Sequence, residues 1–315
     1  MTFRRLVIPA LAAASVLALA GCAGSARDDD GRIAVVASTD VYGQIVEEVG
    51  GDLVDVTSIV SSASQDPHSF EPSARDQLAV SRADLIVENG GGYDAFIDTL
   101  LDATGTEAPI LTAVEFSPEW TAGAATDSDG DHDHGDHSHV EGFNEHVWYD
   151  VETMGALAQG IRSQLEVLSP GDADVLRANL DAFLDGIAER RAELAAIDAT
   201  HAGTAIFVTE PVPLYLTEAA GLLNVAPAAF TEAVEEGQDV PPATLLEALK
   251  LLRSGDADVV VANLQTGGAE TGAVVDEAET AGIPVVEFTE TLPDGQTYLS
   301  WMKANIESLA GALPE

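Results

Sequence analysis

Short apolar runs alternate along this chain with longer segments in which apolar residues recur at helical spacing. In the first half, apolar or β-like runs cover residues 33–38, 54–60, 84–88 and 109–111, and the helical segments cover 40–49, 74–81 and 94–101. In the second half, the apolar runs cover 205–209, 258–263 and 284–288, and the helical segments cover 241–252, 272–281 and 298–309. Repeated strand–helix units predict an α/β fold whose parallel sheets are covered on both faces.

The middle of the chain breaks this alternation. Residues 151–168 have helical periodicity, and a second amphipathic segment follows at 173–199, with Leu176, Leu180 and Phe183 on its apolar face. At 1.5 Å per residue this second helix would be about 40 Å long, enough to run along a whole domain. We therefore predict two α/β domains, at 32–168 and 201–315, joined by one long rigid helix at 169–200, with a ligand site in the cleft between them.

The N-terminus has the pattern of a bacterial export signal. Arg4 and Arg5 precede an apolar run at 6–20 that is shorter than a typical membrane span, and the run ends in Leu-Ala-Gly-Cys22. This pattern predicts a lipoprotein signal peptide at 1–21, acylation of Cys22 and a flexible tether at 22–31. The protein would then be anchored by lipid at the extracytoplasmic face of the cell membrane. A plain secretory signal and an uncleaved anchor helix are the alternatives.

The composition limits the range of functions. The chain has 54 acidic and 13 basic residues, a formal net charge of -41, and Cys22 is its one cysteine. Such a charge disfavours nucleic acid and raises the local concentration of cations, although it also serves solubility alone. A single cysteine excludes an intrachain disulfide, so the fold must depend on its core.

An acidic, histidine-rich loop is predicted at 118–142. It contains the run Asp-His-Asp-His-Gly-Asp-His-Ser-His at 131–139, with no apolar periodicity. Imidazole nitrogens and carboxylate oxygens are ligands that divalent metal ions accept. The predicted auxiliary capture residues are His132, His134, His137 and His139. A solvated spacer is the other interpretation of this loop.

Four further candidate ligands lie near predicted strand ends. They are His68, His146, Glu210 and Glu290, two in each predicted domain. Open α/β sheets bind ligands outside the carboxyl ends of their strands, so facing domains would bring two imidazoles and two carboxylates together. Taken singly, each residue has an ordinary interpretation, as a loop histidine, an aromatic-cluster histidine, a helix cap or a surface acid.

Several motifs together resemble the zinc/manganese-specific solute-binding lipoproteins of bacterial ABC importers, the cluster 9 family. The resemblance covers nearly everything after Cys22. The motifs are Asp66-Pro-His68 with Glu71-Pro72, His146-Val-Trp148, the long helix after Ser169-Pro170, and Tyr298-Leu-Ser-Trp-Met302 with Asn305-Ile306. The histidine-rich loop also stands where zinc-binding members of the family carry theirs.

The resemblance implies a monomeric protein that captures one divalent ion and delivers it to a membrane permease with its ATPase. It implies His68, His146, Glu210 and Glu290 as ligands, and a stiff connector that permits only small domain shifts. Zinc members place a histidine where this chain has Glu210, and manganese members place a glutamate there. The family commonly has Asp at the position of Glu290, for which Glu287, Asp294 or a water could substitute.

Zn²⁺ is the favoured cargo and Mn²⁺ the next. Two imidazoles and two carboxylates form a harder site than zinc usually occupies, which suits manganese, whereas the clustered loop histidines suit zinc. A metallohydrolase is a less favoured alternative, because the sequence has no His-Glu-x-x-His pair, Gly-x-Ser-x-Gly elbow or phosphate loop. A metal-dependent adhesin or surface interaction protein is the other. We expect no enzymatic activity.

Overall fold

A computed structural model describes residues 31–62, 65–120, 142–263, 265 and 267–314. The predicted signal peptide, Cys22, the tether up to residue 30 and the loop histidines lie outside the described residues. Within the described part, no helix combines the length and apolar character that crossing a membrane requires.

The N-terminal domain is built on a four-stranded parallel sheet in the order β2-β1-β3-β4. Its strands are β1 (Ile33–Thr39), β2 (Val54–Val60), β3 (Leu85–Glu88) and β4 (Ile110–Thr112). Its helices are α1 (Asp40–Gly50), α2 (Ala74–Val80), α3 (Phe96–Thr104) and α4 (Val151–Leu168), with short 3-10 turns at Gly51–Leu53, Ala113–Phe116 and Val147–Tyr149.

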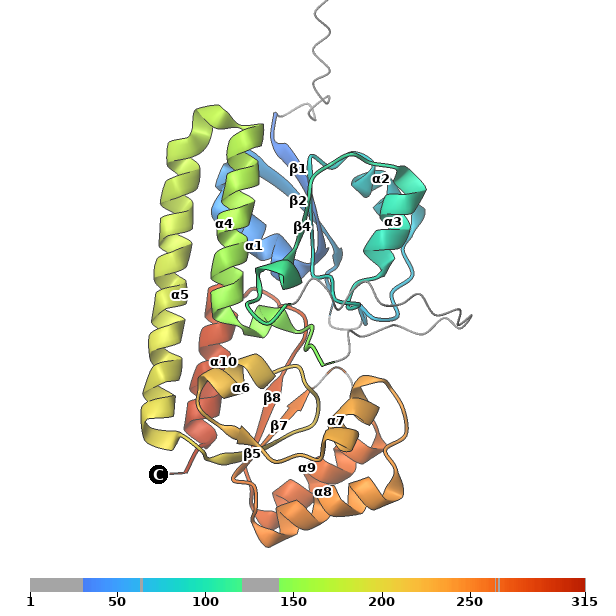
Figure 1. The fold of residues 1–315 in the computed structure, drawn as a ribbon, viewed down its shortest axis with the longest axis vertical. Coiled ribbons are helices and arrows are strands. Elements are labelled where there is room, and N and C mark those ends of the chain that lie inside the picture. Colours follow the sequence, from blue (N-terminus) through green and yellow to red (C-terminus); the bar gives the residue numbers. More distant parts are fainter. Residues whose placement is uncertain (1–30, 63–64, 121–141, 264, 266, 315) are drawn as a thin grey trace, which may run out of the picture.

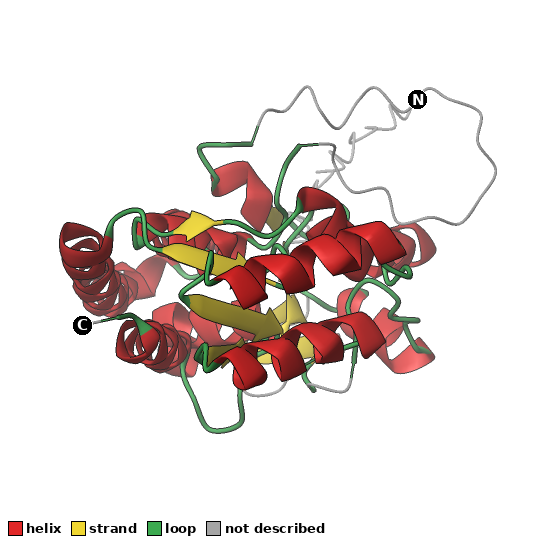
Figure 2. Ribbon diagram, turned by 90° about the horizontal axis from the view of Figure 1, so that it is seen from below, coloured by secondary structure: helices red, strands yellow, loops and turns green. Residues whose placement is uncertain are grey.

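The C-terminal domain repeats this plan in the order β6-β5-β7-β8, again all parallel. Its strands are β5 (Ala205–Val208), β6 (Leu223–Asn224), β7 (Val259–Asn263) and β8 (Val285–Phe288). Its helices are α6 (Leu214–Ala219), α7 (Ala228–Glu235), α8 (Pro242–Ser254), α9 (Ala269–Ala281) and α10 (Tyr298–Ala312). Figure 2, seen from below, shows helices on both sides of the strands.

Alternate residues of each central strand enter different layers of the core. Val35 and Ala37 of β1 belong to an inner core, whereas Val36 belongs to an outer one beneath α2 and α3. In β5, Val208 faces the inner core and Phe207 an outer one. Side chains alternate across a strand, so strands covered on both faces must be apolar at every position. This explains why the central strands appear in the sequence as nearly continuous apolar runs.

The helix α5 (Ala173–His201) joins the two domains and runs along both of them (Figure 1). It begins after a 3-10 turn at Pro170–Asp172, and it packs against α4 in the N-terminal domain and α10 in the C-terminal part. Arg190 of α5 donates to the backbone oxygen of Leu299 in α10 (3.3 Å). A Cβ on Gly186 would come within 2.4 Å of Leu299, so glycine permits this close approach.

Hydrogen bonds and ring contacts also tie the N-terminal domain to the C-terminal chain. The backbone N–H of Tyr298 donates to Gln44 of α1 (2.7 Å), and its hydroxyl donates to the backbone oxygen of Trp148 (2.8 Å). Tyr149 donates to the backbone oxygen of Thr289 (2.6 Å) and stacks on Phe288, with ring centroids 5.8 Å apart. A shared inner core and these contacts restrain movement of one domain against the other.

Glu88, the last residue of β3, is a carboxyl held at the edge of the core. It accepts a hydrogen bond from the hydroxyl of Thr112 (2.8 Å). Burial, reinforced by the charge of Asp94, raises the pKa of Glu88 to about 7 from 4.5. The folded state therefore holds this proton more tightly than the unfolded state does, so Glu88 costs stability as the pH rises from 4.5 through 7.

We therefore expect Glu88→Gln to stabilise the protein by about 3 kcal/mol at pH 8, because a neutral amide avoids the buried charge. Near pH 4.5 the two proteins should be equally stable, since Glu88 is then protonated in the folded state. Urea unfolding at both pH values measures the difference, with exposed Glu107→Gln as the control. An equal gain in stability at both pH values would contradict the raised pKa of Glu88.

Candidate metal centre

His68 lies in the turn that follows β2. Asp66 accepts hydrogen bonds from the backbone N–H of His68 (2.9 Å) and from the hydroxyl of Ser69 (2.7 Å), so its side chain closes the turn. The imidazole meets the ring of Tyr93 edge to face, with centroids 4.8 Å apart. The turn and this ring contact together aim the imidazole into the space between the domains.

His146 is fully buried and is oriented by Asn144. The side-chain oxygen of Asn144 accepts from the backbone N–H of His146 (3.2 Å) and lies 2.7 Å from its Nδ1. An amide oxygen only accepts, so Nδ1 carries a proton and Nε2 is the atom available to a ligand. Asn144 is itself held by the C-terminal domain, because its amide donates to the backbone oxygen of Pro211 (3.0 Å).

The two imidazoles converge on one carboxylate oxygen. Oε1 of Glu235 lies 3.2 Å from Nε2 of His146 and 3.6 Å from Nε2 of His68. Glu145 joins this group, and potential ligand atoms of all four residues lie within 4.8 Å of one another. Neither Glu235 nor Glu145 is among the ligands predicted from the sequence. Glu145 directly precedes the predicted ligand His146, and this position could have marked it as a candidate ligand. Glu235 lies in an acidic stretch of the sequence that has no pattern to distinguish it.

Glu210 and Glu290 follow β5 and β8 and are buried, with 1% and 4% exposure. Asn263, the last residue of β7, joins them: its amide donates to Glu210 (2.8 Å) and to Glu290 (2.6 Å). The backbone N–H of Glu290 donates to the side-chain oxygen of Gln265 (2.5 Å). Three neighbouring strand ends of the second sheet thus hold both predicted carboxylates at one place.

Tyr93 connects this carboxylate pair with the imidazoles. Its ring also lies 5.8 Å from that of His146, and its hydroxyl donates to Glu290 (3.4 Å). Tyr93 thus links the pair Glu210 and Glu290 to the imidazoles. Among the described residues, however, the group whose potential ligand atoms lie within 4.8 Å of one another contains His68, His146, Glu145 and Glu235, and neither Glu210 nor Glu290. The two proposed substitutes for Glu290, Glu287 and Asp294, are exposed side chains, whereas Glu290 is buried.

Burial and neighbouring charges shift the pKa values of the histidines and of Glu290 in this cluster. Burial lowers the pKa of His146, but the carboxylates of Glu235, Glu145 and Glu290 outweigh it and raise that pKa to about 9. Burial and the neighbouring charge of His146 lower the pKa of His68. Burial raises the pKa of Glu290. A divalent cation here would replace the proton of His146 and satisfy the buried carboxylates.

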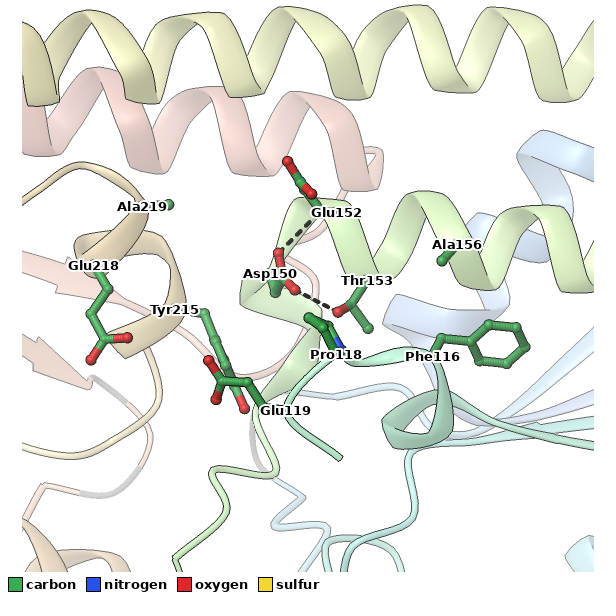
Figure 3. Close-up of a pocket in the computed structure, with 10 residues that line it drawn as sticks. All are labelled: Phe116, Pro118, Glu119, Asp150, Glu152, Thr153, Ala156, Tyr215, Glu218 and Ala219. Carbon is green, nitrogen blue, oxygen red and sulfur yellow. Dashed lines mark hydrogen bonds between the residues drawn. The ribbon is translucent and has the colours of Figure 1, made fainter. Parts of the chain in front are cut away.

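A hollow of about 490 Å³ is lined by residues other than those of this cluster (Figure 3). Glu119, Asp150, Glu218 and Tyr215 are among its lining residues. Asp150 follows the His146 motif in the sequence, but it caps α4 by accepting from the backbone N–H of Glu152 (3.0 Å). Its carboxylate therefore has a structural role.

Two α/β domains fixed on one long helix, with imidazoles and carboxylates meeting between them, define a helix-linked solute-binding protein. The chain belongs to the family described as "Zinc-uptake complex component A periplasmic", whose sequence model matches residues 35–312. This confirms the family predicted from the motifs.

Relatives agree with this assignment, and a solved structure agrees with the fold. The chain is 30% identical over 177 residues to the manganese-binding lipoprotein MntA of Halalkalibacterium halodurans, an alignment that covers 55% of this chain and 53% of MntA. It is 26% identical to the manganese ABC transporter substrate-binding lipoprotein PsaA of Streptococcus anginosus, over 95% of this chain and 96% of PsaA. The crystal structure of ZnuA matches with a TM-score of 0.70 at 22% identity, over 89% of this chain and 99% of ZnuA, which confirms the predicted fold.

The raised pKa of His146 predicts how metal affinity changes with pH. Below pH 9 an incoming ion must displace the His146 proton, so affinity should rise about tenfold per pH unit between pH 6 and 8. This places the pH dependence above the reference histidine value of about 6.5. Calorimetry with Zn²⁺ in buffers of different ionisation enthalpy should detect about one proton released per ion at pH 7. An affinity independent of pH would contradict displacement of this proton.

Proposed function

We propose that the chain is the substrate-binding component of an ABC importer that captures one Zn²⁺ or Mn²⁺ ion in the interdomain cleft. His68, His146, Glu210 and Glu290 are the proposed ligands, and a membrane permease with its ATPase is the proposed recipient. The observation that carries this proposal is the convergence of two imidazole Nε2 atoms on a carboxylate oxygen within a largely buried group of two histidines and two glutamates.

The donor set suits a transition metal ion. Neutral imidazole and carboxylate bind Zn²⁺ and Mn²⁺, whereas Mg²⁺ and Ca²⁺ prefer oxygen ligands alone. Zinc binds most such sites more tightly than manganese, so we keep Zn²⁺ as the favoured ion in vitro. With Glu210 in place of a third imidazole the site is comparatively hard, and metal supply then decides which ion is carried.

Delivery requires that the protein stay beside its permease. We propose a lipid anchor on Cys22 after removal of residues 1–21, with the segment to residue 31 as the tether and a monomer as the working form. Relatives that bear the name lipoprotein support the anchor. The histidines at 132, 134, 137 and 139 are proposed to gather ions weakly ahead of the cleft.

Family membership favours transport over catalysis, in agreement with the expectation of no enzymatic activity. The adhesin alternative differs from the importer in one consequence. An importer must fail when the cleft cannot bind metal, whereas adhesion through another surface would persist.

The binding test uses a chain in which His132, His134, His137 and His139 are replaced by alanine. Into it we place His68→Ala with His146→Ala, or His201→Ala as the matched control at the end of α5. The double variant should lose stoichiometric Zn²⁺ binding by calorimetry, because both nitrogen donors are gone, and the control should keep it. Retention of one tightly bound ion by the double variant would refute the proposed site.

The transport test complements a strain that lacks its own high-affinity metal importer, supplied with this chain and its cognate permease. Cells carrying the His68→Ala, His146→Ala variant should stop growing under chelation, and added Zn²⁺ or Mn²⁺ should restore growth. Equal growth of the variant and the unmodified chain would favour the adhesin reading.

A further inference from the structure

We propose that Glu235 is a metal ligand, supplied by α7 of the C-terminal domain to the two imidazoles of the N-terminal domain. The inference rests on the proposed function and adds a donor to its ligand set. Figure 1 shows α7 on the side of the lower domain that faces the upper one.

The distances at Glu235 have the dimensions of a coordination shell. In a tetrahedral site with bonds of about 2.1 Å, neighbouring ligand atoms lie about 3.4 Å apart. Oε1 of Glu235 lies 3.2 Å from Nε2 of His146 and 3.6 Å from Nε2 of His68. One ion at bonding distance from both nitrogens can therefore also bind this oxygen without a large displacement of the three side chains.

The burial and the surroundings of the Glu235 carboxylate favour the binding of a cation. The Glu235 side chain is 10% exposed, and its Oε1 makes no hydrogen bond of good geometry with any described residue. Nε2 of His146 is likewise buried without a hydrogen bond within the described chain. These two buried atoms face each other 3.2 Å apart and make no hydrogen bond of good geometry with any other described group, so a metal ion bound by both would satisfy them together.

The position of Glu235 on its helix also favours the binding of a cation. Glu235 is the last residue of α7, where the negative end of the helix dipole disfavours a carboxylate. The helix is fixed to the domain by Phe230, which is fully buried and meets Phe207 with ring centroids 5.4 Å apart. Glu235 is thus carried by an anchored element, and binding an ion through it ties α7 to the imidazoles.

The neighbour Glu236 supplies a matched control, because it has the same charge and is exposed. Glu235→Gln and Glu236→Gln are compared in the background without the four loop histidines, using one equivalent of Co²⁺ as a spectroscopic probe and Zn²⁺ by chelator competition. Glu235→Gln should weaken Zn²⁺ binding by at least about 100-fold, since loss of a mere supporting partner already costs roughly 10–100-fold. The Co²⁺ d–d bands should change in position or intensity, and Glu236→Gln should match the unmodified chain.

An unchanged Co²⁺ spectrum in Glu235→Gln, whatever its affinity, would overturn the ligand assignment. His146→Ala separates this failure from a failure of the proposed function. If His146→Ala loses the spectrum while Glu235→Gln keeps it, the cleft binds metal without Glu235. If both variants bind Co²⁺ as the unmodified chain does, the proposed metal site, and with it the proposed function, is wrong. Thermal unfolding of each variant confirms that it is folded.

Discussion

The structure depends on one electrostatic constraint: buried imidazoles and carboxylates from two domains face each other across the boundary between them. His146 is fully buried beside Glu145, Glu235 and Glu290. Such a cluster is costly unless charges and hydrogen bonds are matched, because burial penalises every isolated charge. In the metal-free protein, a proton on His146 supplies part of this balance. A divalent cation supplies it more completely, and this difference is the physical basis of capture.

The scaffold holds the donors in place from both sides. Asn144 orients His146 while bonding to the C-terminal domain, and Asn263 holds Glu210 and Glu290 together at the end of β7. Around them, α5 and a shared inner core join the two domains. Such a frame favours capture by small local movements over wide hinge opening, because preformed ligands lose little entropy on binding.

Much of this could be predicted from the sequence. The long strands, α4 and α5 were predicted within a few residues, because buried parallel strands and amphipathic helices leave strong periodic signals. The prediction missed α6, β6 and α7, which are two to eight residues long and lie in a stretch interrupted by prolines. The strand-end rule selected His68, His146, Glu210 and Glu290, of which the structure brings the two histidines into the group of potential metal ligands. It could not locate Glu235, because that residue reaches the cleft from a short helix whose place is set by tertiary packing of Phe230.

The most direct test is a crystal structure of the loaded protein with anomalous scattering recorded at the zinc and manganese absorption edges. The account predicts one fully occupied ion in the interdomain cleft, within about 2.0–2.2 Å of Nε2 of both His68 and His146, with carboxylate oxygens completing its shell. An empty cleft, with metal bound only to residues 131–139, would contradict it.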